Sequence, residues 1–231
     1  MRAYVFCGGF GTRLRSVIGD SQKALVQVRG KPFLTRVLRQ LAAAGIVEVV
    51  LCAHYRADQV AEKLDALSQD AGLSLDMVIE PTPLGTGGAL LNALRESPPE
   101  GRYLALNADT FLDSEAYRLA AAADDNVLVA ARVEDRGRYG SLEINALGRL
   151  LALREKGQEG PGLVNAGVYA FNPGTFANAQ VRACSMERDL LPGLLAGEGI
   201  GVLEYAGRFI DIGTPESLGR YVNDFHGDAM S

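Results

Sequence analysis

The sequence predicts an α/β fold, in which a mostly parallel central sheet carries helices on both faces. Three observations predict it. Short β-branched runs alternate with helical patterns through the first half of the chain, and a glycine-rich loop follows the first strand directly. In addition, 48% of the 231 residues are apolar and 22% are charged, which is the balance of a globular protein with a sizeable core.

Strands and helices alternate through residues 1–125. Strands are expected where apolar residues run together, at Ala3–Cys7, Val47–Ala53, Leu73–Ile79 and Tyr103–Asn107. Helices are expected where apolar residues recur at helical spacing, at Pro32–Ala44, Ala57–Leu67, Thr86–Leu94 and Ser114–Ala122. Ser114 is the expected cap of the last helix. This alternation indicates βαβ crossovers and a parallel sheet.

Strands predominate in residues 126–231. They are expected at Val127–Val133, Gly140–Ile144, Leu150–Arg154, Val164–Phe171, Gly201–Tyr205 and Arg208–Ile212. A hairpin turn is expected at Asn145–Gly148, and helices near Met186–Leu195 and Pro215–Phe225. We expect this half to form a mixed-sheet elaboration folded onto the first half, so that residues 1–231 form one α/β domain.

Ligands of such sheets bind at the carboxyl ends of the strands. The loops after Phe6, Ile79, Asn107, Arg154 and Ile210 are therefore expected to share one crevice. Glycine is unusually frequent, with 27 residues against about 7% in an average protein, which indicates places where the backbone approaches something closely.

The net charge of −5 argues against a nucleic-acid partner or an anionic membrane surface. The longest apolar runs are shorter than the about 20 residues that span a membrane, and glycines follow the N-terminus too soon for a secretory signal. Cys7, Cys52 and Cys184 are widely spaced and odd in number, which favours buried free thiols and a cytoplasmic location. A homo-oligomer is compatible with these observations.

The first loop has the sequence Gly8-Gly9-Phe10-Gly11-Thr12-Arg13-Leu14. It lacks the third glycine of a dinucleotide-binding fingerprint and the Gly-Lys-Ser/Thr of a P-loop. What remains is a loop whose backbone amides can form an anion-binding nest, with Arg13 directed at phosphates. The alternative is a tight turn with surface charges.

This loop, followed nine residues later by Lys23, resembles the signature of the sugar-1-phosphate nucleotidylyltransferases. Within that family the chain is most similar to the D-glycero-D-manno-heptose 1-phosphate guanylyltransferases. Further matches extend from residue 2 to about 225, at Glu80–Gly88, Leu106–Phe111, Arg138–Gly140, Glu155–Lys156, Asn165–Tyr169 and Phe209–Glu216. The resemblance implies a Rossmann-like, mostly parallel to mixed central sheet, with a nucleotide-binding half at 1–125 and a sugar-binding half at 126–231.

Two positions depart from the family pattern. Ala24 follows the signature lysine where proline is usual, and Ala108 precedes the strand-end aspartate where glycine is usual. The first change loosens the turn that holds Lys23, and the second adds a methyl group near the ligand. Neither removes a charged group that the chemistry needs.

The implied reaction is attack by a sugar 1-phosphate oxygen on the α-phosphorus of a nucleoside triphosphate, with loss of pyrophosphate. Two anions must meet, so catalysis rests on positioning and cations. The resemblance places the triphosphate against Gly8, Gly9, Gly11, Thr12 and Arg13. Arg13 would stabilise the leaving group, and Lys23 would neutralise the sugar phosphate or the α-phosphate. The alternative for both is a solvated surface cation.

Asp109 and Asp211 are the expected metal ligands, and Asp109 is also counted as catalytic. Each follows apolar residues and precedes a turn, where a carboxylate can point into the crevice. The sequence has no Cys/His spacing typical of zinc, and carboxylates favour a hard cation such as Mg²⁺ bound against the α-phosphate. The alternative is that each aspartate only caps a turn.

The loop with Glu80, Gly85 and Thr86 is expected to receive the base. A carboxylate at Glu80 can accept both the N1–H and the N2–H₂ of guanine, whereas thymine and uracil offer one donor there, so GTP is favoured. The expected use of Gly85, Gly87 and Gly88 is close approach of the backbone. The alternative for Glu80 is an exposed side chain without a role.

Gly140, Glu155, Lys156 and Asn165 are the expected contacts of the sugar phosphate, with Lys156 on its phosphate. The alternatives are a turn glycine, a rim salt bridge between Glu155 and Lys156, and a strand polar group satisfied by backbone. We therefore expect a Mg²⁺-dependent transferase that makes GDP-heptose from GTP and D-glycero-α-D-manno-heptose 1-phosphate.

Two alternatives to this function stay open. The nearer is the same chemistry on mannose 1-phosphate with GTP, or on a hexose 1-phosphate with UTP or dTTP. The other is a non-catalytic nucleotide-sugar sensor. The joint presence of Arg13, Lys23, Asp109 and Asp211 argues against the sensor, because a binder needs no metal-holding carboxylates.

Overall fold

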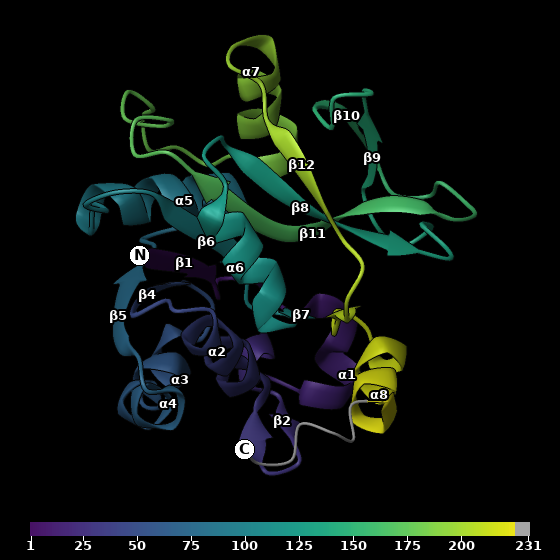
Figure 1. Ribbon diagram of the computed structural model, residues 1–231. Coiled ribbons are helices and arrows are strands. Elements are labelled where there is room, and N and C mark those ends of the chain that lie inside the picture. The colour runs from purple at the N-terminus through teal and green to yellow at the C-terminus, as the bar shows by residue number, and fades with distance from the viewer. Residues whose placement is uncertain (225–231) are drawn as a thin grey trace.

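A single mixed sheet passes through both halves of the chain in the computed structural model, which describes residues 1–224 (Figure 1). Within these residues the sheet has nine strands: β1 (Arg2–Phe6), β4 (Glu48–Ala53), β5 (Ser74–Ile79), β6 (Tyr103–Asn107), β8 (Val127–Val133), β9 (Ser141–Ile144), β10 (Leu150–Arg154), β11 (Gly162–Phe171) and β12 (Gly201–Tyr205). Two small antiparallel pairs lie outside it: β2 (Gln27–Val28) with β3 (Lys31–Pro32), and β7 (Thr110–Leu112) with β13 (Phe209–Asp211).

The two halves meet where β11 pairs antiparallel with β6. In this register Val168 lies opposite Leu106. On one side of the junction β6, β1, β4 and β5 are all parallel. On the other side β11 is antiparallel to both β8 and β9, and β12 returns parallel to β8. The predicted mostly parallel sheet with a mixed elaboration is confirmed.

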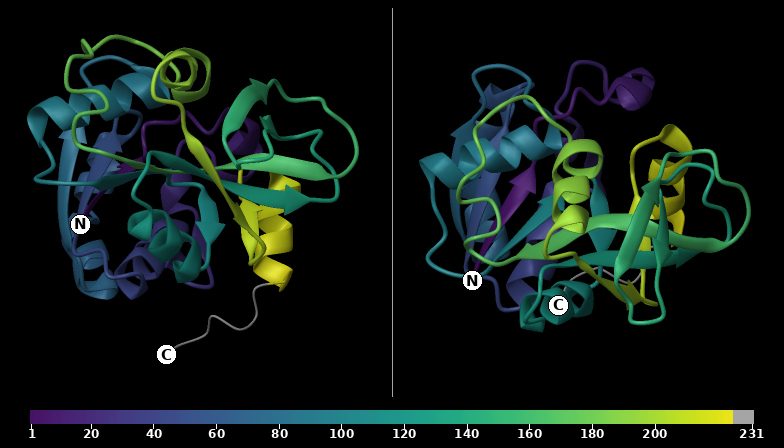
Figure 2. Two further views of the ribbon diagram at one scale, coloured as in Figure 1. Left: turned by 45° about the horizontal axis from the view of Figure 1, so that its top comes forward. Right: turned by 90° about the horizontal axis from the view of Figure 1, so that it is seen from above.

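Helices cover both faces of this sheet, as the two views in Figure 2 show. The α-helices are α1 (Arg15–Ile18), α2 (Phe33–Ala43), α3 (Ala57–Ala61), α4 (Leu64–Ala71), α5 (Gly85–Glu96), α6 (Ser114–Ala122), α7 (Leu191–Ala196) and α8 (Pro215–Asp224). Buried residues of α2, α4, α6 and α8 belong to one apolar cluster, and those of α5 and α7 to the other.

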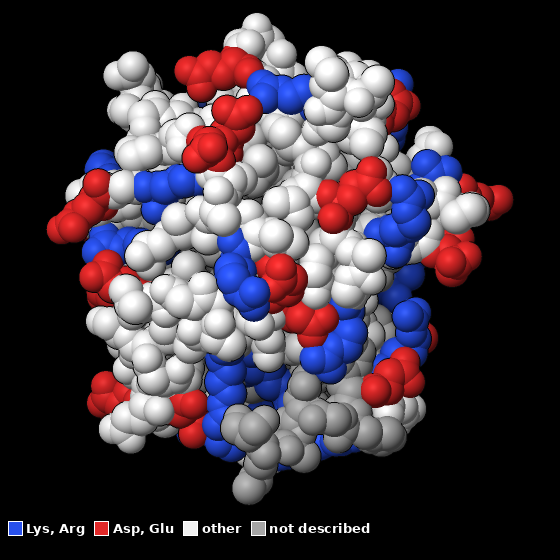
Figure 3. All heavy atoms as spheres, viewed as in Figure 1, with Lys and Arg blue, Asp and Glu red and all other residues white. Residues whose placement is uncertain are grey.

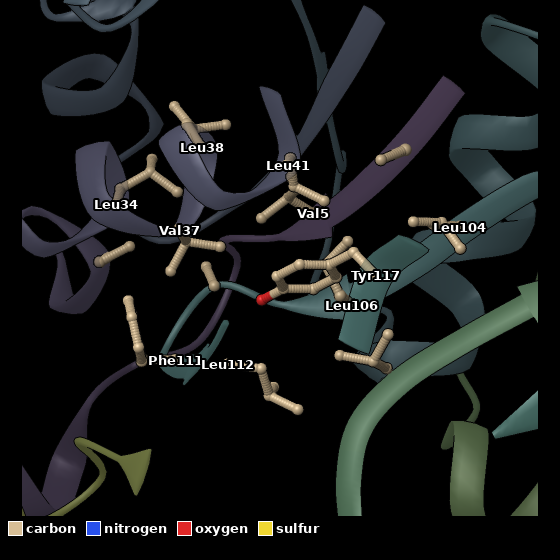
Figure 4. Packing of buried hydrophobic residues seen from close by; sticks show 14 of the residues in the cluster. Val5, Leu34, Val37, Leu38, Leu41, Leu104, Leu106, Phe111, Leu112 and Tyr117 are labelled. Atoms are coloured by element: carbon tan, nitrogen blue, oxygen red, sulfur yellow. The ribbon is translucent and has the colours of Figure 1, made fainter. Parts of the chain in front are cut away.

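Alternation along the central strands fills both clusters. Val5 of β1 faces α2, where Val37 and Leu41 pack against it (Figure 4), whereas Tyr4 faces α5 and lies edge-on to Tyr103. These side chains are fully buried, which explains why β1 and β6 appear in the sequence as continuous apolar runs.

Three predicted elements differ from the structure. The helix expected at Ala57–Leu67 is interrupted after α3, because the amide of Lys63 bonds the carbonyl of Val60 and closes a tighter turn. Ser114 is the first residue of α6 rather than its cap, and Asp113 precedes it. The helix expected from Met186 starts as a π turn, Met186–Leu190. Phe225, the expected end of α8, lies outside the described residues.

The state of the cysteines and the distribution of surface charge agree with the expectations from the sequence. Cys7, Cys52 and Cys184 are free and buried, as predicted. Basic and acidic side chains are interspersed on the face in Figure 3. Among residues 1–224, no helix has the length and apolar character needed to cross a bilayer.

Candidate active site

One cavity of about 880 Å³ lies at the carboxyl ends of β1 and β6. It is lined by residues from the loops after Phe6, Ile79, Asn107, Arg154 and Ile210, so the predicted shared crevice is confirmed. Every residue predicted for the site lines it: Gly8, Gly9, Gly11, Thr12, Arg13, Lys23, Glu80, Gly85, Thr86, Asp109, Gly140, Glu155, Lys156, Asn165 and Asp211. Their individual roles stay predictions.

The glycine-rich loop turns sharply into a 3₁₀ turn at Thr12–Leu14. Gly11 has a left-handed backbone (φ 60°), and its carbonyl accepts a bond from the amide of Leu14 at 2.9 Å. The buried side chain of Leu14 anchors the turn, which leaves Arg13 exposed on the cavity wall. Within residues 1–224 the guanidinium of Arg13 has no ion-pair or hydrogen-bond partner, so it is available to an anion.

Gln22 links the start of this loop to the turn around Lys23, although no sequence motif marked it. Its side chain is 1% exposed, donates to the carbonyl of Cys7 and accepts from the amide of Ala24. A proline at position 24 has no N–H to donate. The alanine that departs from the family pattern therefore provides a hydrogen bond that fixes the turn around Lys23, and the expectation that Ala24 loosens this turn is wrong.

Lys23 and Asp109 form an ion pair inside the cavity, in which Nζ donates to Oδ2. The side chains are 13% and 30% exposed. Strand pairing brings the second carboxylate nearby, because Asp211 of β13 lies opposite Thr110 of β7 and the amide of Ile212 bonds the carbonyl of Asp109 at 2.9 Å. One oxygen of Asp211 accepts from the amide of Gly213, so this aspartate closes a turn and lines the cavity as well.

These two carboxylates suit a hard divalent cation. Within residues 1–224, no group of three or more His, Cys, Asp or Glu side chains could hold a metal without further ligands. A cation at Asp109 and Asp211 thus needs additional oxygen ligands, which phosphates and water supply to Mg²⁺. Lys23 engages Oδ2 of Asp109, so the other oxygen of this carboxylate is the one that would bind the cation while the ion pair persists.

Glu80 lines the cavity and is buried, at 5% exposure, so the alternative of an exposed side chain is wrong. One carboxylate oxygen accepts from the amide of Leu84 at 2.9 Å, and burial raises the pKa of the carboxyl group above its usual range. A Cβ on Gly8 would lie 2.9 Å from the other oxygen. A side chain at position 8 would therefore displace the carboxylate of Glu80 from its present position.

The glycines at the start of α5 serve the protein's own backbone. The amides of Gly87 and Gly88 both donate to the carbonyl of Cys184, at 3.0 and 3.1 Å. A Cβ on Gly85 would lie 2.7 Å from the same oxygen, and one on Gly87 2.9 Å from the carbonyl carbon of Ser185. Packing of residues 182–185 thus explains a run of glycines that the sequence suggested for approach to the base.

Replacing Gly88 with alanine is expected to destabilise the fold by about 1–3 kcal/mol, because the new methyl group overlaps the carbonyl of Arg182 and the side chain of Leu84. Gly193 in α7 is the matched control, since its Cβ would meet nothing within 4 Å, and alanine there is expected to stabilise by about 0.5 kcal/mol. Urea unfolding measures both. Equal effects of the two substitutions would contradict the packing explanation.

Asn165 on β11 organises the side of the cavity that is predicted to take the sugar. Its amide oxygen accepts from the amide of Gly167 at 2.9 Å, and its NH₂ donates to the hydroxyl of Tyr169 at 2.7 Å. The backbone of Asn165 bonds the carbonyl of Gly140 at 3.1 Å. In the described residues no ion pair joins Lys156 to Glu155, so the predicted alternative of a rim salt bridge between them is wrong.

Glu187 and Arg188 also line the cavity, although no sequence motif predicted them there. They lie on the π turn that follows the long irregular segment after β11. No spacing rule connects such a segment to the glycine-rich loop, because only the packing against α5 brings the two together. A π turn is rare and frequently marks a functional site.

The chain is similar to known proteins over almost its whole length. Residues 2–226 match the Nucleotidyl transferase family. Among curated proteins, the chain is 31% identical over 224 residues to the mannose-1-phosphate guanylyltransferase catalytic subunit beta of Drosophila pseudoobscura pseudoobscura, with 94% of this chain and 60% of that protein covered. It is 30% identical over 216 residues to the D-glycero-alpha-D-manno-heptose 1-phosphate guanylyltransferase of Campylobacter jejuni, with 94% and 96% covered. The chain thus spans 60–62% of the length of the first three relatives.

Solved structures show the same fold. HddC from Yersinia pseudotuberculosis superposes with a TM-score of 0.85 at 32% identity over 97% of this chain and 99% of that one, and its complex with GMP-PN with a TM-score of 0.84. The inositol-1-phosphate CTP transferase from T. maritima, at 16% identity, shares the fold alone. The length of the match and the two relatives at 30% identity or more together show that this chain belongs to the nucleotidyl transferase family.

Proposed function

We propose that this protein transfers GMP from GTP to a sugar 1-phosphate, giving a GDP-sugar and pyrophosphate. The observation that carries the proposal is the shared cavity, which is lined by Arg13, Lys23 and Lys156 and also by the paired strand-end carboxylates Asp109 and Asp211. Three cations suit two anionic substrates, and two carboxylates suit the cation that would lie between them. Relatives named for guanylyltransfer support this choice of reaction.

The sugar phosphate oxygen forms a bond to the α-phosphorus, and the bond from that phosphorus to the bridging oxygen breaks. Pyrophosphate leaves with the electron pair, so no general base is needed when the attacking phosphate is ionised. Arg13, exposed at the glycine-rich loop, would bind the leaving pyrophosphate. Lys23 would move from Asp109 to a phosphate oxygen, and Lys156 would hold the sugar phosphate in line. Mg²⁺ held by Asp109 and Asp211 would supply Lewis-acid neutralisation of the phosphates.

D-glycero-α-D-manno-heptose 1-phosphate is the favoured acceptor. The relative from Campylobacter jejuni that is named for this sugar is covered over 96% of its length, whereas the relatives named for mannose 1-phosphate are covered over 60–62%. Mannose 1-phosphate with GTP is the second candidate, because those relatives are equally similar in sequence.

A panel of substrate pairs tests the function. Pyrophosphate release is measured with GTP, UTP, dTTP, CTP and ATP against heptose, mannose and glucose 1-phosphates, with Mg²⁺ and with chelator. The fastest release is expected for GTP with the heptose, and none with chelator. Absence of release with every pair would exclude the transferase proposal. Release that is undiminished by chelator would exclude a requirement for Mg²⁺.

Replacing Glu80 with glutamine is expected to reduce the preference for GTP over UTP by about 10–100-fold in kcat/KM, because the carboxylate that accepts two guanine donors is lost. In the wild-type protein the KM for GTP is expected to rise as the pH falls through the pKa of Glu80, which burial raises above that of an exposed glutamate. The variant loses this pH dependence. An unchanged GTP-to-UTP ratio in the variant would exclude Glu80 as the guanine-binding residue.

A further inference from the structure

Glu187 lies on the cavity wall between two groups of predicted ligand contacts. One oxygen accepts from the hydroxyls of Ser185 at 2.9 Å and Thr86 at 3.4 Å, and the other from the hydroxyl of Tyr169 at 3.3 Å. Through Tyr169 it is linked to Asn165 on the sugar side, and through Thr86 to the start of α5. The carboxylate is therefore fixed by three neutral hydroxyl donors, which come from α5, from β11 and from the cap of its own π turn.

The support beneath Glu187 is rigid. Tyr169 is fully buried and stacks on Phe171, with 5.8 Å between ring centroids and 8° between their planes. Burial, with Glu187 as a smaller contribution, raises the pKa of the Tyr169 phenol well above its ordinary value. The phenol thus stays protonated at any working pH and donates its single hydrogen to Glu187 while it accepts from Asn165.

The charge of Glu187 restricts what it can face. Among residues 1–224 no ion pair involves it, although the cavity contains cations. Unlike Asp109 and Asp211, which are predicted to face the phosphates through a cation, a carboxylate without a cation repels the phosphates of the two substrates, so a neutral part of a ligand suits Glu187. Two carboxylate oxygens offer about four acceptor sites, of which the three hydroxyls take three. A ligand hydroxyl is the group that the remaining site suits.

We propose that Glu187 is a specificity-determining residue that accepts a hydroxyl group of the sugar 1-phosphate, with Tyr169 as its positioning residue. The proposal rests on the proposed guanylyltransfer and extends it, because it names the part of the protein that distinguishes sugars by their hydroxyl groups. The base is the other neutral part of the substrates, and Glu80, which also lines the cavity, is the residue predicted to accept its donors. The link to Asn165 places Glu187 on the sugar side.

Glu187→Gln tests the proposal against a purely structural role. The variant is expected to raise the KM for the preferred sugar 1-phosphate about 10–100-fold, to leave the KM for GTP within about two-fold, and to narrow the preference among sugar 1-phosphates. Tyr169→Phe is expected to raise the KM for the sugar phosphate in the same direction and by less. Calorimetric titration of the sugar 1-phosphate alone is expected to show the same loss of affinity.

Asp189→Asn is the matched control. Asp189 lies on the same π turn, and its carboxylate accepts from the amide of Ser185 at 2.6 Å, but it does not line the cavity. Its loss is expected to leave both KM values within about two-fold of wild type. Equal rises of both KM values in Glu187→Gln, or the same rise in Asp189→Asn, would overturn the proposal.

The two hypotheses fail differently. A wild-type protein without turnover removes the proposed transferase, and calorimetry with the sugar 1-phosphate still tests Glu187. A wild-type protein with turnover, combined with unchanged sugar affinity in Glu187→Gln, removes the Glu187 proposal and leaves the transferase in place.

Discussion

Replacing Asp109 with asparagine is expected to lower kcat about a thousand-fold while reducing the free energy of unfolding by no more than about 1–2 kcal/mol. The substitution keeps the shape of the side chain but removes the charge that would hold Mg²⁺ and that now pairs with Lys23. Asp211→Asn is expected to behave similarly, because the side-chain oxygen that asparagine retains is uncharged and binds Mg²⁺ more weakly than a carboxylate. Steady-state pyrophosphate release measures kcat, and urea unfolding measures stability.

Asp70→Asn serves as the control for this change. Asp70 pairs with Lys31 and Arg39 on the surface, at 40% exposure, and lies outside the cavity. Its loss is expected to leave kcat at the wild-type value. Near-normal turnover in Asp109→Asn, under conditions in which Asp70→Asn is also normal, would exclude Asp109 from catalysis.

Replacing Lys23 with methionine is the second change with a large expected effect, a fall in kcat of about a hundred- to a thousand-fold. Methionine fills the space of the stem of Lys23, which is 13% exposed, but it cannot neutralise a phosphate. Combining it with Asp109→Asn is expected to cost much less than the product of the single effects, because the two residues act as one unit. Effects that multiply would show that the ion pair has no part in the reaction.

The central sheet could be predicted from the sequence because its strands are buried on both faces. Ala3–Phe6, Tyr103–Leu106 and Val127–Ala131 are uninterrupted apolar runs, and each lies in a strand of the structure, within one residue of the expected start. The short antiparallel pair of β7 and β13 could not be predicted in this way. Its register is a tertiary contact, so the placement of Asp211 beside Asp109 could not be read from spacing.

The site was predictable where motifs are local and unpredictable where packing forms it. The glycine-rich loop and the strand-end residues line the cavity as expected. Gln22 and Glu187 were not predicted. The buried side-chain amide of Gln22 bonds the backbone next to the glycine-rich loop, and Glu187 lies on a turn that is distant in the sequence. For Gly87 and Gly88, residues 182–185 of the protein itself make a close approach that requires glycine, and their use towards the base stays a prediction.

The most direct test of the account is identification of the product. The protein is incubated with GTP, Mg²⁺ and D-glycero-α-D-manno-heptose 1-phosphate, and the mixture is analysed by mass spectrometry alongside a pyrophosphate assay. GDP-heptose and pyrophosphate are expected in equal amounts, with no GDP-sugar from the Asp109→Asn variant. Hydrolysis of GTP without formation of a nucleotide sugar, or no turnover with any sugar 1-phosphate, would contradict the proposed transfer of GMP to a sugar 1-phosphate.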